Sequence, residues 1–387
     1  MTDTPVNRVW RIARPMGPVP GPEDFALSQE PLPEPGPGQV LMRTIFIGIA
    51  PGVRPLLPYA GAEPGVANDG SAGRVDASAD DLPNPMRIRV GERMRSGIVP
   101  SASIYAGGTV GQVVVSHHSG FAPGDYIFGG RLWQDYEVVD GDASLRLDPA
   151  ELPIEADLAA VGRSAFTGWV GYRRFSGAKA GETMVVSAAA GAVGMIVVQM
   201  AKADGLRVIG IASGPAKCAF VTGQLGADAC IDRLDGDIGA ALDALAPTGI
   251  DIYFDNVGGR IQAPVFARLK PFGRMIVCGM AAEYGGLESS VLPTGLILAK
   301  RLCIKGFVVL DHEGDYPAFR AEVAKMLRAA TLVYRREIYQ GLEQAPQALA
   351  DCLTGRSSGG KILVQVAPEI EIDQGGCGTV IGAKVGA

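Results

Sequence analysis

A short run of small residues in the middle of the chain has the spacing of a phosphate-binding turn. The run Ala189-Ala190-Gly191-Ala192-Val193-Gly194 matches G-x-G-x-x-G with alanine at the first position, between an apolar segment, Thr183–Ala188, and a predicted helix, Met195–Ala203. Small residues let the backbone approach a pyrophosphate at the helix N-terminus, and Gly194 lets the helix pack closely on the strand. A tight structural turn has a similar composition, but the strand-turn-helix context favours a dinucleotide site. The residues that we expect in this site are Gly191, Ala192, Val193 and Gly194.

The segment after the next strand indicates which dinucleotide is bound. An NAD-selective site usually has Asp or Glu about twenty residues beyond the turn, where it holds the ribose hydroxyls. Here the segment Ile211–Lys217 contains no acidic residue and offers Ser213 and Lys217, while Arg233 follows the third predicted strand. A 2′-phosphate would meet two cations and a hydroxyl, so we expect NADP(H). The alternative is that these are ordinary surface charges.

Few residues are available for metal or imidazole chemistry. The chain has three histidines, His117, His118 and His312, and six cysteines without a C-x-x-C pair. We therefore expect no metal site, no histidine-centred triad and no disulfide framework, which fits a reducing compartment and a cytoplasmic location. No secretory signal is visible in Met1–Pro15.

Charge and hydropathy argue against two kinds of partner. The net charge is −6 without a long basic stripe, so we do not expect nucleic-acid binding. Nineteen uncharged residues separate Glu182 from Lys202, but the glycine-containing turn lies among them. We interpret this stretch as a buried strand followed by a buried helix, not as a membrane span. We therefore expect neither nucleic acid nor a membrane as a partner, and a small-molecule substrate stays open.

The pattern changes twice along the chain. From Asn7 to about Leu147, short β-type runs alternate with Gly and Pro, which predicts an antiparallel, barrel-like domain. From about Pro153 to Asp311, apolar strands alternate with helices, which predicts a doubly wound parallel α/β sheet, the Rossmann arrangement. The predicted parallel strands are Thr183–Ala188, Leu206–Ala212, Ala229–Asp232, Ile250–Asn256, Arg274–Gly279 and Leu302–Val309.

These patterns divide the chain into domains. We expect a β domain over residues 1–154 and 316–367, to which a strand at Lys361–Val366 returns, and a dinucleotide-binding domain over residues 155–315. Residues 368–387 are expected to form a loosely held extension. The stretch from Pro55 to Pro100 reads as a long surface loop, and its arginines are either a solvated face or contacts for an acidic substrate.

Several motifs together resemble a known family. They are Ala188–Gly194, Tyr253-Phe254-Asp255-Asn256-Val257-Gly258-Gly259, Phe272-Gly273-Arg274, Cys278-Gly279, Trp133–Tyr136 and Gly355–Val364. The chain resembles the zinc-free medium-chain dehydrogenase/reductases, and within them the prostaglandin/leukotriene reductases, plant double-bond reductases and bacterial curcumin reductase. The resemblance implies a GroES-like β-barrel domain beside the Rossmann domain, and NADPH-dependent reduction of a carbon–carbon double bond conjugated to a carbonyl. Hydride would pass to the β-carbon, and the enolate would be protonated at the α-carbon.

Such a reaction needs a hydrogen-bond donor on the carbonyl oxygen. Tyr284 follows the fifth predicted strand at the ligand-binding edge of the sheet and matches a tyrosine position in the related reductases. A packing or surface role is the alternative for Tyr284, Tyr136 and Tyr105 are reserve donors, and the cofactor's ribose hydroxyl could also serve. By similarity, further residues line the cofactor: Asn256, Cys278, Gly279, Phe307, Val308, Val309 and Ser358.

Three departures from the family pattern concern the substrate. Relatives usually have Asp-Pro-Tyr-Met-Arg where this chain has Ala50-Pro51-Gly52-Val53-Arg54, and often Pro-Gly-Leu-Thr-Ala-Tyr where it has Ser164-Ala165-Phe166-Thr167-Gly168-Trp169. Their Asn-x-Gly-Lys is Ser358-Gly359-Gly360-Lys361 here. The residues that we expect in the substrate pocket are Arg54, Tyr105, Tyr136 and Trp169.

Two other functions remain open at this point. A quinone reductase of the same superfamily needs the same cofactor site, and a non-catalytic NADPH-binding sensor or structural protein needs no substrate site at all. Relatives often dimerise, and the sixth strand could pair at a sheet edge, so we expect a homodimer.

Overall fold

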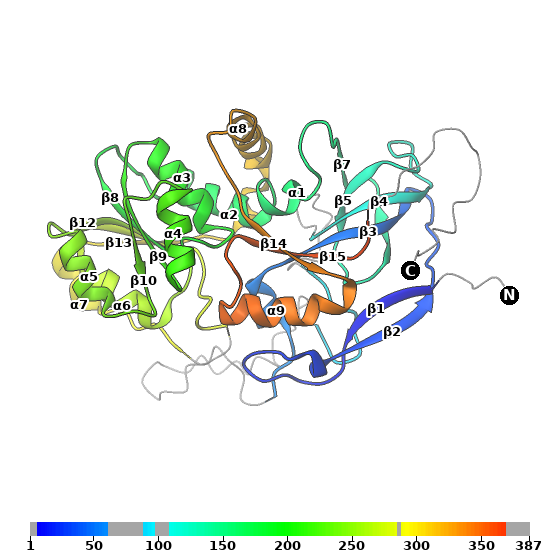
Figure 1. Ribbon diagram of the computed structural model, residues 1–387, viewed down its shortest axis with the longest axis horizontal. Helices are drawn as coiled ribbons and strands as arrows, with labels where there is room; N and C mark the ends of the chain where they lie inside the picture. The colour runs from blue at the N-terminus through cyan, green and yellow to red at the C-terminus, as the bar shows by residue number, and fades with distance from the viewer. Residues whose placement is uncertain (1–5, 61–87, 97–107, 285–287, 369–387) are drawn as a thin grey trace.

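The computed structural model describes residues 6–60, 88–96, 108–284 and 288–368. A parallel sheet with its helices forms one part of the molecule, and an antiparallel β domain forms the other (Figure 1). Tyr105, most of the predicted 55–100 loop and the predicted C-terminal extension beyond Pro368 lie outside the described residues.

The parallel sheet has six strands in the order β10-β9-β8-β11-β12-β13. The strands are β8 (Thr183–Ser187), β9 (Arg207–Ala212), β10 (Ala229–Asp232), β11 (Ile250–Asp255), β12 (Leu269–Val277) and β13 (Cys303–Gly306). This order confirms the expected doubly wound sheet, because strand order reverses on either side of β8. Two predicted bounds were wrong by three residues or more: β12 begins five residues before Arg274, since Leu269 also pairs with β11, and β13 ends at Gly306, where pairing with β12 stops.

Helices cover both faces of this sheet because its strands are apolar on both sides. In β8, Met184 and Val186 pack into one buried cluster and Val185 into another on the opposite face. The helices are α3 (Gly194–Ala203), α4 (Pro215–Gly223), α5 (Ile238–Leu245), α6 (Gly259–Ala267) and α7 (Thr294–Lys300). The uncharged stretch after Glu182 is therefore a buried strand and helix. Over the described residues, no helix combines the length and hydropathy that crossing a bilayer requires.

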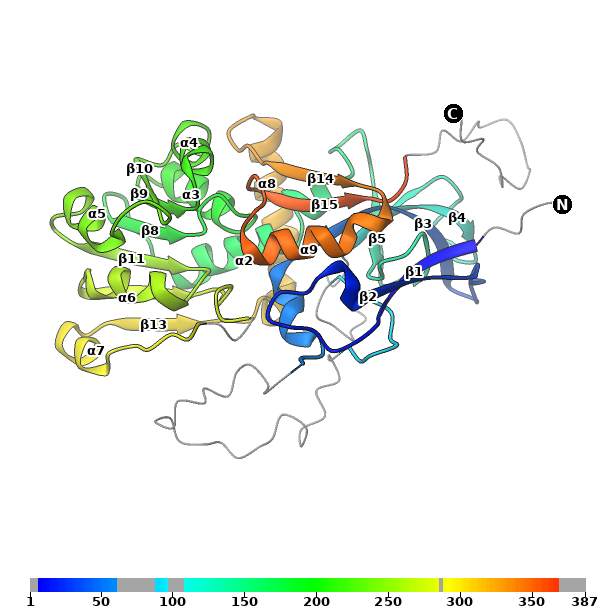
Figure 2. The ribbon, with the colours of Figure 1, turned by 60° about the horizontal axis from the view of Figure 1, so that its bottom comes forward.

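The β domain is built on a seven-stranded sheet that draws on both ends of the chain. Its strands are β3 (Gln39–Ile49), β4 (Thr109–Ser116), β5 (Tyr126–Gly130), β6 (Tyr136–Asp140), β7 (Leu145–Leu147), β14 (Arg336–Gln340) and β15 (Lys361–Gln365). The strand predicted to return does so, since β15 pairs antiparallel with β3. A hairpin of β1 (Val6–Ile12) and β2 (Phe25–Pro31) and the helix α9 (Ala345–Thr354) lie beside this sheet (Figure 2).

Two short helices and one longer helix lie where the chain leaves and re-enters the β domain. They are α1 (Ala156–Ala159), α2 (Arg163–Val170) and α8 (Tyr316–Arg328). Phe319 and Val323 of α8 pack in the same buried cluster as α2 and α3, and the Tyr316 hydroxyl donates to the Val161 carbonyl at 2.6 Å. Although we assigned residues from 316 to the β domain, the contacts of α8 are with the core beside the parallel sheet. The boundary at residue 315 stays a prediction.

One buried carboxyl gives the fold a measurable pH dependence. Glu137 on β6 is fully enclosed, and burial raises its pKa from 4.5 to about 7, although it accepts hydrogen bonds from the Arg131 and Leu132 amides. Because the folded pKa exceeds the unfolded value, the folded state binds the proton more tightly. This contribution to the free energy of unfolding is complete below pH 4.5 and is lost as pH rises through about 7.

We expect Glu137→Gln to remove this dependence. The amide keeps the shape of the side chain and cannot ionise. From pH 5 to pH 8 the free energy of unfolding of the wild type should therefore fall by roughly 3 kcal/mol relative to that of the variant. Urea unfolding at both pH values measures the change, with the exposed Glu343→Gln as the control. Parallel pH profiles for wild type and Glu137→Gln would contradict the assignment.

Candidate cofactor and active site

The predicted cofactor residues lie along one edge of the parallel sheet. Asp255 of β11 is level with Val277 of β12, and Val277 is level with Gly306 of β13. Asn256, Cys278 and Phe307 are the next residues on these three strands, so they form a row just beyond the carboxyl ends. The turn after β8, Ser213 after β9 and Arg233 after β10 continue this edge. Ligands bind at this edge in doubly wound sheets.

The turn after β8 has the form of an anion site. A side chain at Gly194 would place its Cβ 2.3 Å from the Ala188 carbonyl oxygen, so only glycine lets α3 start this close to the strand. The backbone N–H groups of Val193 and Gly194 have no acceptor among the described residues. Unpaired donors at a helix N-terminus suit the diphosphate of a dinucleotide. The turn therefore fits the group that its sequence predicts.

The two predicted cations lie near one another, Arg233 against Ser213 and Lys217 against Gly355. Arg233 Nε donates to Ser213 Oγ at 2.6 Å, and Lys217 Nζ donates to the Gly355 carbonyl at 2.8 Å. Burial, and next the charge of Arg233, lower the pKa of Lys217, which places the two cations in one another's field. The nearby carboxylate of Asp232 accepts from the amides of Gly214 and Leu234. The structure thus brings together the hydroxyl and the cations that a 2′-phosphate would need.

A buried carboxylate shapes the turn after β11. Asp255 accepts hydrogen bonds from Ser187 Oγ at 2.8 Å and from the amides of Val257 and Gly258 at 3.0 and 3.1 Å. Ser187 Oγ in turn accepts from the Asn256 amide. Sequence reasoning quoted Asp255 in a motif but gave it no role. An acidic residue at the end of an otherwise apolar strand was the available signal.

Tyr284 lies seven residues after the end of β12, and its phenol is close to Gly279 beside this row. Its phenol oxygen accepts from the Met280 amide at 3.3 Å and lies 3.5 Å from where a Cβ on Gly279 would be. Its O–H donates to no described residue, so it is available to a carbonyl oxygen. Burial raises the pKa of Tyr284, which keeps the phenol protonated at neutral pH. Burial also raises the pKa of the neighbouring Cys278 thiol, so that side chain is an uncharged wall.

Two stacked aromatic rings lie at the end of this row, just after β13. Phe307 stacks on Phe175 with ring centroids 5.1 Å apart, and its ring lies 2.9 Å from where a Cβ on Gly171 would be. Val308 is 57% exposed and Val309 is half-buried. Phe307 therefore packs against the segment after α2, while Val308 is open to a ligand.

The β domain reaches the glycine turn through the segment before β15. The Gly360 amide donates to the Ala190 carbonyl at 2.6 Å, and Gly191 and Gly360 form an isolated bridge. Ser358 in this segment donates from both its amide and its hydroxyl to Glu337. Gly360 thus holds the predicted cofactor turn against the other domain by main-chain contact alone.

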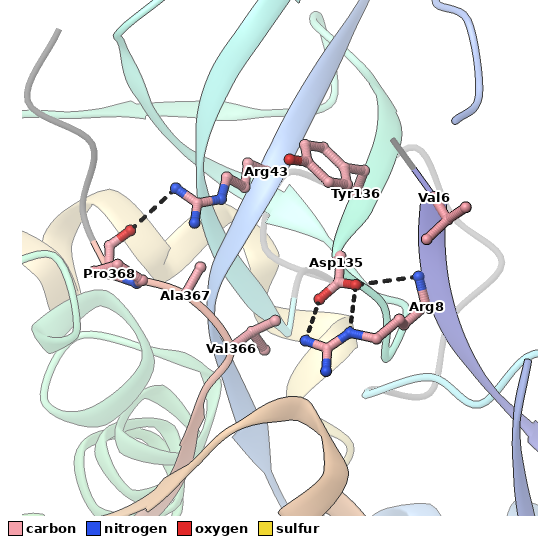
Figure 3. A pocket seen from close by; sticks show the side chains of 8 residues that line it. All are labelled: Val6, Arg8, Arg43, Asp135, Tyr136, Val366, Ala367 and Pro368. Carbon is pink, nitrogen blue, oxygen red and sulfur yellow. Dashed lines mark hydrogen bonds and ion pairs between the residues drawn. The ribbon is translucent and has the colours of Figure 1, made fainter. Parts of the chain in front are cut away.

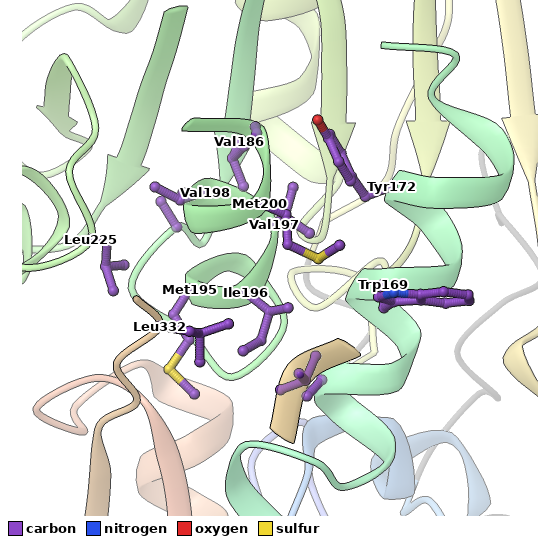
Figure 4. Packing of buried hydrophobic residues seen from close by; sticks show 14 of the residues in the cluster. Trp169, Tyr172, Val186, Met195, Ile196, Val197, Val198, Met200, Leu225 and Leu332 are labelled. Atoms are coloured by element: carbon purple, nitrogen blue, oxygen red, sulfur yellow. The ribbon is translucent and has the colours of Figure 1, made fainter. Parts of the chain in front are cut away.

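The predicted substrate-pocket residues are not brought together. Arg54 is 1% exposed and donates to the carbonyls of Gly17 and Pro18, with its guanidinium over the Tyr59 ring. Tyr136 lines a surface pocket of about 260 Å³ with Arg43 and Pro368, beside β1 (Figure 3). Trp169 is buried in the cluster between α2 and α8, where its indole N–H donates to Glu322 (Figure 4). Tyr105 lies outside the described residues.

A second cavity lies where the two domains meet, and sequence reasoning did not assign it. It has a volume of about 80 Å³, and its lining includes Gly52, Arg163, Ser164 and Lys361. The signal in the sequence was that two departures from the family pattern, at Ala50–Val53 and at Ser164, both line it. Within the described ranges, no cluster of three or more His, Cys, Asp or Glu side chains has the arrangement of a metal site.

Comparisons with known proteins agree with this architecture. Residues 192–327 match the zinc-binding dehydrogenase family. The NADPH-dependent curcumin reductase of Escherichia coli is 34% identical over 369 residues, which covers 93% of this chain and 97% of that protein. The NADP(+)-dependent 2-alkenal reductase of Nicotiana tabacum is 33% identical and covers 66% of this chain and 75% of its own length.

A solved structure extends this likeness to three dimensions. The crystal structure of CurA from Vibrio vulnificus in complex with NADPH has a TM-score of 0.78 and 31% identity, covering 93% of this chain and 99% of that one. With a third of all residues shared over nearly the whole length of a relative, and with the same fold, the chain belongs to the medium-chain dehydrogenase/reductase superfamily.

Proposed function

We propose that this protein is an NADPH-dependent reductase of carbon–carbon double bonds conjugated to a carbonyl group. The observation that carries the proposal is the edge of the parallel sheet. Along it lie unpaired turn amides for a diphosphate, two cations for a 2′-phosphate and a protonated tyrosine with a free O–H. The relatives named for NADPH-dependent reduction of curcumin and for 2-alkenal reduction support the same reaction class.

In this mechanism the protein positions groups and stabilises charge. NADPH, when bound, supplies the hydride that reaches the β-carbon of the substrate. Ala192, Val193 and Gly194 hold the diphosphate, while Ser213, Lys217 and Arg233 hold the 2′-phosphate. The O–H of Tyr284 donates to the carbonyl oxygen and stabilises the negative charge that this oxygen gains as the enolate forms. A proton from solvent at the α-carbon then completes the reduced ketone or aldehyde.

The assay for this proposal is the absorbance of NADPH at 340 nm. Purified protein should consume NADPH with enones or enals, and mass spectrometry should show a product heavier by two hydrogens at the former double bond. Binding of NADPH without its consumption by enones, enals or quinones would favour a sensor or structural role. Consumption with quinones alone would identify the quinone reductase alternative.

Three further expectations accompany the proposal. The division into domains at residues 154 and 315, the cytoplasmic location and the homodimer all stay predictions. The dimer has support in the sheet order, because among the described strands β13 has a neighbour on one side only. An unpaired edge strand offers its backbone to a second copy.

A further inference from the structure

The cavity at the domain junction is lined by positively charged side chains. It is the cavity of about 80 Å³ introduced above, and we call it the Lys361 cavity. Two of its described lining residues, Arg163 and Lys361, are cationic, and none of them is acidic. The volume suits a few heavy atoms, since one water takes up about 30 Å³ in the liquid. A small anionic group fits such a space in both size and sign.

Lys361 is buried, and within the part of the chain that the structure describes no carboxylate makes a hydrogen bond to it. Its side chain is 6% exposed, and Nζ donates to the Ile49 carbonyl at 2.8 Å and to Ser164 Oγ at 3.4 Å. Both acceptors are neutral, so they satisfy hydrogen bonds without balancing the charge. Burial lowers the pKa of Lys361 to about 8. A buried ammonium with uncharged partners is costly unless an anion comes to it.

The opposite wall adds positive potential. Arg163 and Ser164 begin α2, whose N-cap residue Gly162 provides no side-chain acceptor. The positive end of the helix therefore faces the same space. Burial, and next the charge of Arg131, lower the pKa of Arg163 to about 10, with Glu313 and Tyr316 acting in the other direction. At neutral pH Arg163 remains charged.

Most of the remaining lining is apolar, with Ser96 as the one other polar side chain among the described lining residues, and the cavity is close to the proposed cofactor turn. Phe128 and Leu158 line the cavity, so carbon atoms can accompany the anionic group. Lys361 follows Gly360, whose amide donates to Ala190 in the cofactor turn. Ala50 and Gly52 also line the cavity, and they add neither a carboxylate nor a large side chain to it.

We infer that the Lys361 cavity binds a carboxylate carried by the substrate, so that the substrate class is an α,β-unsaturated carbonyl compound with an acidic end. This inference rests on the proposed function. Lys361 and Arg163 would pair with the carboxylate, and Ser164 would donate a further hydrogen bond. These are specificity-determining residues; the hydride chemistry does not use them.

Matched pairs of substrates test the inference. Each pair is an enone with a terminal carboxylate and its methyl ester, with one to four methylene groups between the enone and the carboxyl carbon. At the best chain length, kcat/KM for the acid should exceed that for the ester by about 10- to 100-fold, as expected for hydrogen bonds to a charged group. A ratio near one at every length would overturn the inference.

Two variants and one control locate the preference. Lys361→Met and Arg163→Met should each bring the acid-to-ester ratio toward one while the ester is still reduced. Lys325→Met, on the exposed face of α8, should leave the ratio unchanged. An unchanged ratio in both cavity variants would place the carboxylate elsewhere and overturn the inference. Failure to consume NADPH with either acid or ester would overturn the proposed function and this inference with it.

The wild-type protein provides a second measurement if the variants do not fold. The value of kcat/KM reports ionisation in the free enzyme. Because Lys361 loses its charge as pH rises through about 8, the acid-to-ester ratio should fall between pH 7 and pH 9. Arg163 stays charged over this range, and Cys352, whose pKa is raised by burial to about 11, stays neutral. A ratio that is constant over this range would count against Lys361.

Discussion

Replacement of Tyr284 by phenylalanine is expected to lower kcat with an enone by ten- to a thousand-fold, in the range seen when one oxyanion donor is removed. The phenyl ring fills the same space, so the change removes the O–H and little else. The affinity for NADPH should stay the same, because the cofactor contacts that we propose for this chain are made by the other residues of the sheet edge. Single-turnover oxidation of NADPH at 340 nm measures the chemical step, and fluorescence titration measures cofactor binding.

Tyr136→Phe is the matched control, since it removes a phenol hydroxyl from the surface pocket beside β1. Its turnover should equal that of the wild type. If Tyr284→Phe kept full turnover, the ribose hydroxyl of the cofactor would become the better candidate for the donor. If Tyr136→Phe lost turnover instead, the donor would have to be sought in the β domain.

The second large effect concerns the choice of cofactor. Lys217→Ala combined with Arg233→Ala should weaken NADPH binding by roughly a hundredfold and leave NADH binding nearly unchanged. The reason is local: the two cations lie near one another after β9 and β10, and only NADPH has a 2′-phosphate to place between them. Titration of the two dinucleotides at fixed ionic strength gives both dissociation constants.

A variant with the same change in net charge separates contact from general attraction. Lys325→Ala with Arg328→Ala removes two cations from α8, and NADPH binding should be nearly unaffected. Equal weakening of NADPH and NADH by the Lys217 and Arg233 changes would refute the 2′-phosphate assignment. Equal weakening of NADPH by both double variants would mean that long-range charge, not contact, attracts the cofactor.

The sheet edge was predictable because parallel strands impose a simple geometry. Once the apolar runs identify six parallel strands, every residue just after a strand belongs to the same edge. This is why Ser213 and Arg233 could be predicted at this edge without knowledge of any contact, whereas Asn256 and Cys278 were expected there from the family resemblance. The glycine turn added the position of the helix N-terminus.

The substrate pocket was less predictable because it depends on where individual side chains point. Trp169 differs little in sequence context from a pocket residue, but on α2 it faces α8 and donates to Glu322. Arg54 is a cation by type, yet its hydrogen bonds go to two carbonyls. Lys361 shows the reverse case: it lies in a β-strand, and only the contacts of its ammonium with Ile49 of β3 and Ser164 of α2 reveal its charge beside a cavity.

The contact between Gly360 and Ala190 has a consequence for how such a protein can diversify. It joins the two domains through a backbone amide and a backbone carbonyl, and the donor position is restricted to glycine, because a Cβ on Gly360 (φ +79°) would lie 2.1 Å from the Arg335 carbonyl oxygen. Other residues of the Lys361 cavity, such as Ala50 and Ser164, line it without taking part in this main-chain contact. They can be exchanged in the course of evolution, and the selectivity for substrates can drift with them, while the main-chain joint continues to align the two domains.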